Sequence, residues 1–295
     1  MSDTLLVTGA AGQLGRAVIR HLLTTLNVPA ARIIATTRKP EQLQDLAAQG
    51  VAVRAADFDA PETLAAAFAG ANRMLLISTD KLDRPGYRAE QHGRAIAAAE
   101  QAGIGHVIYT SMPKPDNSPL LISPDHALTE QALRDSGLAG WTVLRHHWYF
   151  ENLFASLPHI LGSGRWFTAD EGGASADIAR DDLARAAATV LANGGGGKTV
   201  HTLSGAQALT KVEMARILSA ATGKPIEVVQ VPLEGLIQGM VGAGLPRPVA
   251  EVFASFDTNT AQGRVADVTG DYQAITGVAP QSFADWVQAA KAAFA

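Results

Sequence analysis

Three glycines spaced three residues apart, Gly9, Gly12 and Gly15, stand between an apolar run and a helix-period segment in "LLVTGAAGQLGRAV". A glycine-rich turn between a strand and a helix lets the backbone approach a pyrophosphate closely, and it directs the first N–H groups of the helix at the phosphates. Such turns also form for steric reasons alone, and GxxGxxG differs from the GxGxxG of most dehydrogenase folds. The strand before, the helix after and the alternation that continues beyond them favour a dinucleotide site.

The chain roughly 20 residues past the glycines distinguishes NAD from NADP, because an acidic residue at the tip of the second strand would bind the ribose hydroxyls of NAD. Here the tip reads Thr37-Arg38-Lys39. A guanidinium can bind a 2′-phosphate through two parallel hydrogen bonds, so Arg38 favours NADPH; a merely solvated cation is the alternative. The next strand ends in Asp57-Phe58, which suits adenine through a hydrogen bond and a ring face.

No tyrosine of the chain stands four residues before a lysine. The residues four places after Tyr87, Tyr109, Tyr149 and Tyr272 are Gln91, Pro113, Leu153 and Thr276. Ordinary short-chain dehydrogenases use such a pair because a developing alkoxide needs a positioned acid. A quinone does not need that acid, since hydride addition gives a hydroquinone anion that is stable near neutral pH, and a cationic dye takes up hydride without a proton. The chemistry would then rest on holding the nicotinamide and the acceptor together.

Residues at the end of the sixth expected strand are the candidates for contact with the acceptor. His146 and His147 are adjacent in an extended segment, so their side chains point in opposite directions and at most one is expected to reach the acceptor. A ring held by backbone groups is an equal alternative. Tyr149 is expected to line a flat pocket, although aromatic residues leading into a helix also belong to cores. His126 and Glu130 occupy the position of the missing dyad, and as an (i, i+4) pair they need have no catalytic role.

An alternation of short apolar runs with helix-period segments would position these residues. Strands are expected near 4–8, 32–37, 51–55, 73–79, 105–111 and 141–146, and helices near 13–26, 40–48, 61–69, 87–102 and 124–136. This pattern predicts an α/β fold with a doubly wound parallel sheet. Beyond residue 150 we expect helices near 151–161, 181–192, 210–221, 233–243 and 247–256, and one strand at "TVHTLSG". The expected parts are a nucleotide-binding domain at 1–150 and a smaller mixed α/β lobe at 151–295, partly woven back onto the sheet.

Composition excludes several other classes of protein. The 295 residues are 47% hydrophobic and 18% charged, which is typical of a globular protein, and the net charge of -4 gives no positive field for nucleic acid. The chain has no cysteine, so thiolate metal sites and thiol nucleophiles are excluded, and no metal or serine-hydrolase motif is present. The first residues enter a strand directly, and the apolar run near residue 70 is broken by Asn72-Arg73. A cytoplasmic monomer or homodimer without a membrane partner is expected.

Several segments together resemble the atypical short-chain dehydrogenase/reductases of the NmrA-like group, and within it the bacterial type 2 quinone oxidoreductases and triphenylmethane reductase. They are "VTGAAGQLG", "TTRKP", "LLIS", "YTS", "SPDHALTEQALRDSG" and "LRHHWYFEN". The resemblance implies a Rossmann lobe that binds NADPH, a small C-terminal lobe, and a cleft between them for a quinone or a similar flat electrophile. It implies cofactor contacts at Gly9, Gly12, Gln13, Leu14, Gly15, Arg38, Asp57, Phe58, Ser78 and Thr79.

One segment departs from those quinone reductases. Where they read Leu-Arg-Asn-Gly-Trp-Tyr, this chain has His146 and His147, so its acceptor pocket is expected to differ. The expected function is an NADPH-dependent oxidoreductase that transfers hydride to such an acceptor. The alternative is a non-catalytic NADP-binding redox sensor of the NmrA type with the same fold. A nucleotide-sugar epimerase or dehydratase is disfavoured because the Tyr–Lys pair is absent.

Overall fold

A seven-stranded parallel sheet forms the centre of the computed structural model, which describes residues 3–82, 84–194 and 196–294. The ends of the two predicted parts, residues 1–2 and 295, lie outside the described residues. In spatial order the strands are β3 (Ala52–Ala55), β2 (Ile33–Thr37), β1 (Leu5–Val7), β4 (Arg73–Leu76), β5 (His106–Ser111), β6 (Gly140–His146) and β9 (Lys198–Leu203). The doubly wound α/β fold predicted from the alternating pattern is confirmed.

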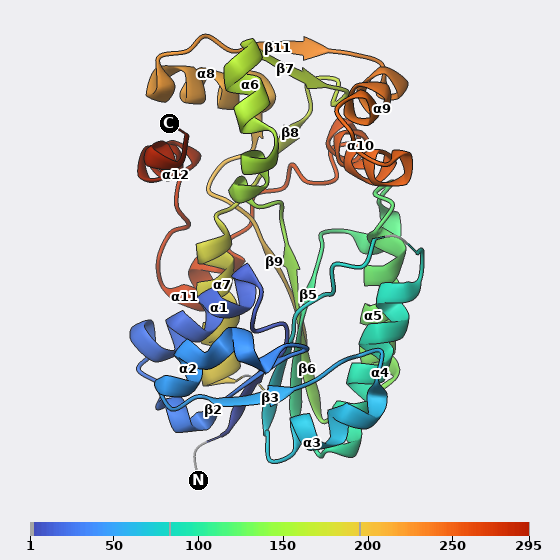
Figure 1. Cartoon of the computed structure of the whole chain (residues 1–295), viewed down its shortest axis with the longest axis vertical. Coiled ribbons are helices and arrows are strands. Elements are labelled where there is room, and N and C mark those ends of the chain that lie inside the picture. Colours follow the sequence, from blue (N-terminus) through green and yellow to red (C-terminus); the bar gives the residue numbers. More distant parts are fainter. Residues whose placement is uncertain (1–2, 83, 195, 295) are drawn as a thin grey trace.

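Two helical layers cover this sheet (Figure 1). On one face lie α1 (Gln13–Arg20), α2 (Gln44–Ala48), α7 (Arg180–Asn193) and α11 (Asp271–Thr276); on the other lie α3 (Leu64–Phe68), α4 (Tyr87–Gln101) and α5 (Ser123–Asp135). Neighbouring residues of one strand face opposite layers: Ile108 packs in the core under α1 and α7, and Tyr109 in the core under α4 and α5. Continuous apolar strands with both faces covered explain why β1, β2, β4 and β5 are buried throughout.

Several predicted boundaries are wrong, each for a local reason. The strand expected to reach residue 79 ends at Leu76, because the next N–H groups bond to side chains instead of to a neighbouring strand. The helix expected over 151–161 is a 3₁₀ turn at Phe150–Ala155 followed by α6 (Leu157–Ser163), which restarts with Pro158 in its first turn. The helix expected over 13–26 ends as α-helix at Arg20 and continues as a π-helical turn, His21–Thr25.

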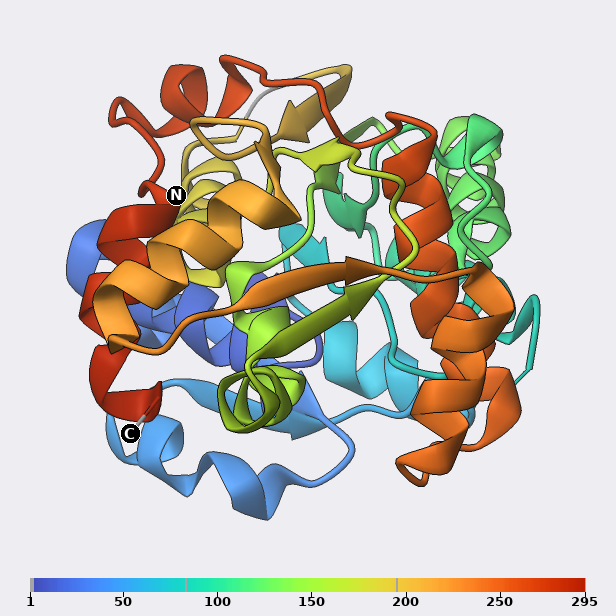
Figure 2. The ribbon, with the colours of Figure 1, turned by 90° about the horizontal axis from the view of Figure 1, so that it is seen from above.

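The second half of the chain forms a smaller mixed lobe above the carboxyl edge of the sheet (Figure 1). Its elements are α6, β7 (Arg165–Thr168), β8 (Ala174–Ser175), β10 (Leu209–Thr210), α8 (Lys211–Thr222), β11 (Glu227–Gln230), α9 (Leu233–Gly242), α10 (Arg247–Ala261) and α12 (Phe283–Ala290). Strands β7 and β11 pair in parallel and, seen from above, lie between α8 and the α9–α10 hairpin (Figure 2). Strands β7, β8, β10 and β11 and helices α11 and α12 were not predicted. Strand β9 pairs with β6 of the large sheet, and α7 packs against that sheet.

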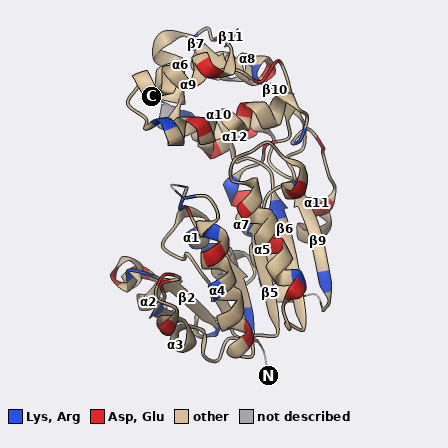
Figure 3. Ribbon diagram, turned by 90° about the vertical axis from the view of Figure 1, so that its right-hand side faces the viewer, with Lys and Arg blue, Asp and Glu red and all other residues tan. Residues whose placement is uncertain are grey.

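Figure 3 shows basic and acidic residues interspersed along the helices of the ribbon. That distribution agrees with a weakly acidic chain that has no strong overall field. None of the helices within 3–82, 84–194 and 196–294 is long and apolar enough to cross a membrane.

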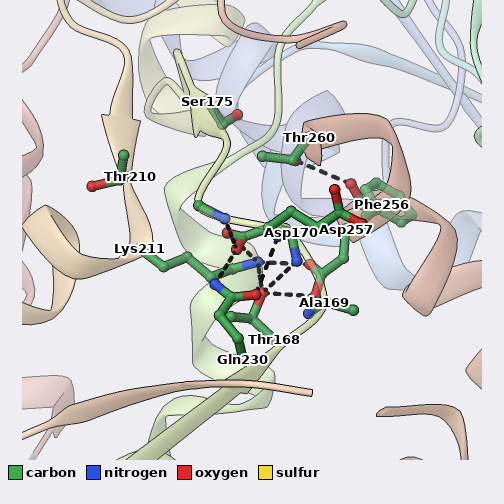
Figure 4. A network of polar contacts seen from close by, with 12 residues as sticks. Thr168, Ala169, Asp170, Ser175, Thr210, Lys211, Gln230, Phe256, Asp257 and Thr260 are labelled. Atoms are coloured by element: carbon green, nitrogen blue, oxygen red, sulfur yellow. Dashed lines mark hydrogen bonds and ion pairs between the residues drawn. The ribbon is translucent and has the colours of Figure 1, made fainter. Parts of the chain in front are cut away.

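An ionic cluster holds the small lobe together (Figure 4). The Lys211 ammonium lies 2.6 Å from an oxygen of Asp257 and 3.4 Å from one of Asp170, and it donates to the Thr168 hydroxyl at 2.8 Å. The amide of Gln230 donates to Asp170 at 2.7 Å. Because Asp170 is fully buried, its charge depends on these partners. The cluster therefore joins β7, β11, α8 and α10.

We expect Lys211→Met to lower the free energy of unfolding by about 3 kcal/mol, because the buried Asp170 and the partly buried Asp257 lose their cation. Arg165→Met is the matched control, since its partner Glu227 and Arg165 itself are exposed, and it is expected to cost less than about 1 kcal/mol. Urea denaturation followed by circular dichroism measures both. Equal losses in the two variants would contradict a structural role for the cluster.

Candidate active site

A cleft of about 450 Å³ opens at the carboxyl edge of the sheet, where the strand order reverses between β1 and β4. Ligands of open α/β sheets bind at such a switch point. The lining comes from the glycine turn and from the chain just beyond β2, β3 and β4: Thr8, Gly9, Ala11, Gly12, Thr36, Thr37, Arg38, Lys39, Gln42, Ala56, Asp57, Phe58, Ile77, Ser78, Thr79, Asp80 and Lys81, together with Gln91 of α4.

The glycine turn is shaped by close backbone contacts. Gly9 has a φ of +60°, in the left-handed region that favours glycine. A Cβ at Gly15 would overlap the Gly9 carbonyl and come within 2.8 Å of the Ala10 Cα, so only glycine lets α1 approach the turn this closely. No side chain caps the N-terminus of α1 at Gly12 and no acid stands in its first turn. The first N–H groups of α1 therefore face the cleft side of the turn without a protein anion.

Cations without protein partners stand at the tip of β2. The side chains of Arg38 and Lys39 are exposed, line the cleft and form no ion pair with any carboxylate of the described chain. Across the cleft, the Gln91 amide donates to Asp59 at 2.9 Å, while its buried carbonyl oxygen has no partner among the described residues. Free cations at one wall and an orphaned acceptor at another fit a ligand that has a phosphate and an N–H donor, as an adenosine phosphate has.

Three side chains hold the backbone where it leaves β4. The N–H groups of Ile77, Ser78 and Thr79 donate to the Thr8 hydroxyl at 3.0 Å, the Thr110 hydroxyl at 2.9 Å and the His92 Nε2 at 3.0 Å. Buried N–H groups must find acceptors, and here the neighbouring strand offers side chains instead of carbonyls. The wall of the cleft at 77–79 is therefore fixed by side chains from β1, β5 and α4.

Behind Thr79 lies a buried polar network between α4, α5 and β5. The Arg88 Nε donates to the Thr79 carbonyl at 2.7 Å, and its Nη2 lies 3.2 Å from the His126 Nε2. The His126 Nδ1 lies 2.8 Å from the Tyr109 hydroxyl. Since a guanidinium only donates, His126 must accept at Nε2 and carry its proton on Nδ1, toward Tyr109. His92 likewise accepts from Thr79 and is therefore neutral.

Burial keeps these histidines uncharged. It lowers the pKa of His92 to about 3, with the Arg88 charge adding to the effect. Burial, then Arg88 and the two nearby histidines, lower the pKa of His126 well below 6.5. The suggested His126–Glu130 pair does not form: both oxygens of the Glu130 carboxylate accept from Arg145, at 2.9 and 2.7 Å. The two residues at the dyad position thus belong to separate networks.

The three predicted acceptor residues lie beyond the cleft lining. His146 is 3% exposed, its Nδ1 is 3.4 Å from the Tyr149 hydroxyl, and its Nε2 has no partner in the described chain. Burial lowers the pKa of His146 to about 3 and raises that of Tyr149 to about 12. His147 is buried in another direction, near the ion pair of Lys114 with Asp267.

Residues of the second half link this segment to the glycine turn and to the loop before α5. Arg180, at the start of α7, donates to the Gln13 side chain, and its guanidinium lies 5.3 Å from the centre of the Tyr149 ring. On the other side, Ser118 donates to Asn259 at 2.6 Å, and the Leu121 N–H donates to Ser255 at 3.2 Å. The loop before α5, which contains Ser118 and Leu121, is therefore hydrogen-bonded to α10.

Comparisons with known proteins agree with this geometry. The model of the NmrA-like family matches residues 1–274. The chain belongs to the NmrA-like family. It is 38% identical over 261 residues to quinone oxidoreductase 2 of Escherichia coli (strain K12), covering 88% of this chain and 89% of that protein. It is 29% identical over 291 residues to the NAD(P)H azoreductase of Xenophilus azovorans, covering 98% and 99% of the two chains.

Solved structures of two proteins superpose closely on this NmrA-like chain. The NADPH complex of the NADPH-dependent quinone oxidoreductase of Escherichia coli has a TM-score of 0.91 at 35% identity, covering 97% of this chain and 99% of that one. The NADP(H) complex of triphenylmethane reductase from Citrobacter sp. has a TM-score of 0.88 at 35% identity, with the same coverage. The family resemblance and the enzyme class expected from it, an oxidoreductase, are confirmed.

In this NmrA-like chain the predicted cofactor residues fall into two groups. Those that line the cleft are Gly9, Gly12, Arg38, Asp57, Phe58, Ser78 and Thr79. Gln13 instead faces Arg180, the Leu14 side chain packs in the core, and Gly15 serves the approach of α1 to the turn. Within 3–82, 84–194 and 196–294 no three His, Asp or Glu side chains gather as a metal site would require.

Sequence reasoning missed Arg88, Thr8 and Thr110. Thr8 stands just past one apolar strand and Thr110 lies in another. Nothing in the local sequence marks their hydroxyls as hydrogen-bond acceptors. Arg88 had a signal that was not used: it stands on the buried stripe of α4, which continues through Gln91, His92, Ala95, Ile96 and Ala99. A charged residue at such a position is rare unless it serves a site.

The buried histidines predict a specific pH dependence of stability. Their pKa values are lower in the folded chain (about 3 for His92 and His146, about 4 for His147) than the usual 6.5. The unfolded chain therefore binds more protons below pH 6.5, so stability is complete above that pH and falls toward pH 4. Each such histidine contributes about 1.4 kcal/mol per pH unit.

Urea denaturation between pH 7.5 and 4.5 measures this slope. We expect His92→Gln to lower the number of protons taken up on unfolding, and hence the slope of the unfolding free energy against pH, by the share of one histidine. His159→Gln, at an exposed position, is the control. A free energy of unfolding that stays constant from pH 7 to pH 5 would contradict the assignment of neutral, buried rings.

Proposed function

We propose that this NmrA-like protein is an NADPH-dependent oxidoreductase that transfers hydride to quinones or similar flat electrophiles. The observation that carries the proposal is the cleft at the β1–β4 switch point, whose β2 tip presents two unpaired cations and no acid. The quinone oxidoreductase and the triphenylmethane reductase, both NADPH enzymes by name or complex, support it.

Each wall of the cleft has a part in holding the cofactor. The N–H groups at the start of α1 and the glycine turn receive the pyrophosphate. Arg38, with Lys39 beside it, binds the 2′-phosphate, and Asp57 and Phe58 contact the adenine. Ser78 and Thr79, held rigidly by their own hydrogen bonds, face the nicotinamide ribose. When bound, NADPH supplies the hydride.

The residues around the nicotinamide end supply position and exclude water, and they supply no acid. The His126 Nε2 already accepts from Arg88 and its ring is neutral, so it has no proton to give toward the cleft. The Tyr109 hydroxyl is fully buried and its pKa is raised by burial. An acceptor whose product is a stable anion, or which needs no proton, fits this arrangement, and water protonates the product after release.

The acceptor is proposed to lie between the two parts of the chain, which divide near residue 150. Residues 1–150 hold the cofactor. Residues 151–295 close the far side through Arg180 and α10, while α7 and β9 return to the large sheet. Tyr149, held by His146 and lying beside Arg180, offers an aromatic face to a flat acceptor. We propose that His146 positions Tyr149.

The decisive experiment follows NADPH consumption by the purified protein with several quinones and one cationic triphenylmethane dye, with NADH in parallel. We expect turnover that prefers NADPH. Arg38→Ala is expected to weaken NADPH binding by roughly 1.5 to 3 kcal/mol, the value of a charge-assisted contact, and to leave NADH use unchanged. Tight NADPH binding without turnover on any acceptor would overturn the proposal in favour of a sensor.

A second measurement concerns the acceptor side. We expect His146→Ala to raise KM or lower kcat for quinones and to leave the Kd for NADPH unchanged, because His146 touches Tyr149 and lies beyond the cleft lining. Tyr149→Phe, which keeps the ring and removes the hydroxyl, is the matched variant and should reproduce the effect. Unchanged kinetics in both variants would return His146 and Tyr149 to purely structural roles.

A further inference from the structure

Arg88 is a buried cation whose contacts are all with neutral groups. The residue is 3% exposed, and its guanidinium donates to the Thr79 carbonyl at 2.7 Å and to the His126 imidazole at 3.2 Å. The remaining nitrogen, Nη1, is covered by protein and has no hydrogen-bond partner in the described chain. A guanidinium taken out of water without a counter-charge costs several kcal/mol.

Two carboxylates of α5 have other hydrogen-bond partners. Glu130 is held by Arg145 through two hydrogen bonds, and Asp125 accepts the N–H of Ala89 at 3.3 Å. Across 3–82, 84–194 and 196–294, no carboxylate forms an ion pair with Arg88. The rings that face it, His92, His126 and Tyr109, are uncharged because burial lowers the pKa of the histidines and raises that of the tyrosine. The guanidinium therefore keeps one nitrogen without a hydrogen-bond partner and has no ion-pair partner within the described chain.

The position of Arg88 relative to the cleft follows from the sheet order. The β2 tip, with Arg38, and strand β4 lie on opposite sides of β1. Thr79, just past the end of β4, begins the polar network that continues past β5 toward His146 on β6. A dinucleotide anchored by its adenosine phosphate at β2 therefore extends its nicotinamide toward the side where Arg88 lies. Arg88 contacts the cleft wall directly, through the Thr79 carbonyl.

We propose that Arg88 makes the site distinguish the two redox states of the cofactor, so that NADPH binds more tightly than NADP⁺. This inference rests on the proposed function, in which the cleft binds NADPH. The two forms share the same phosphates, riboses and adenine, and they differ by one positive charge on the nicotinamide ring. Two unit charges about 10 Å apart at an effective dielectric constant of about 20 repel each other enough to change binding roughly tenfold.

Weaker binding of NADP⁺ than of NADPH helps the proposed reaction after hydride transfer, when the oxidised cofactor must leave. Hydride transfer breaks the C4–H bond of the dihydronicotinamide, both electrons leave with the hydrogen to the acceptor, and the ring is left positive. The quinone becomes a hydroquinone anion and takes one proton from water. Repulsion by Arg88 then speeds the exchange of the oxidised cofactor for the reduced one.

The test measures the dissociation constants of NADPH and NADP⁺ by calorimetric titration at one ionic strength, without an acceptor. We expect a ratio of roughly ten in favour of NADPH in the unmodified protein. Arg88→Met should bring the ratio close to one, mainly by tightening NADP⁺, and Arg88→Lys should retain it. Arg38→Ala is the control: it should weaken both forms equally and leave the ratio unchanged.

Equal affinities in the unmodified protein would overturn the inference without any variant. A ratio retained in a folded Arg88→Met would also overturn it, and Arg88→Gln replaces that variant if methionine prevents folding. If neither cofactor form binds, the proposed function fails; if both bind equally well and NADPH is turned over, only the role of Arg88 fails.

Discussion

The backbone of residues 77–79 is the constraint on which the rest of the site depends. It leaves β4 in the middle of the sheet, where no neighbouring strand continues to pair with it, yet its N–H groups are partly buried. Thr8, Thr110 and His92 supply the three acceptors. A missing acceptor would leave a partly buried donor unpaired, at a cost of up to about 1–3 kcal/mol, so these side chains fix the wall against which the cofactor is proposed to rest.

This constraint determines the charges behind the wall. His92 must be unprotonated at Nε2 to receive the Thr79 N–H, and the Thr79 carbonyl orients Arg88 toward His126. His126 is then committed as an acceptor and cannot act as an acid toward the cleft. One set of hydrogen bonds thus positions the backbone, keeps two histidines neutral and leaves Arg88 without an ion-pair partner in the described chain.

The features that the sequence predicted correctly are those formed by residues close together in the chain. The glycine turn and Arg38 were found because a turn and a strand tip are each a few consecutive residues, and the large sheet because its strands alternate with helical segments. Strands β8 and β10 have two residues each, too few to show a period. The Thr8–Ile77 bond joins residues 69 apart, and the His126–Glu130 pairing failed because Tyr109, Arg88 and Arg145 from other elements compete for the same atoms. Such competition is decided by tertiary contacts, which spacing does not record.

The weaving of the two halves would give the proposed site the rigidity that catalysis by positioning requires. Strand β9 completes the large sheet from the second half of the chain, and Arg180 contacts both Gln13 at the glycine turn and the Tyr149 ring. Two domains joined by a single linker would move relative to each other by default. Here the second half of the chain, proposed to close the acceptor side, shares a strand, a helix and a guanidinium with the first half, proposed to hold the cofactor. A reaction that draws its rate from a fixed distance between two bound molecules needs such a frame, because a displacement of about 1 Å can cost 10²-fold in rate.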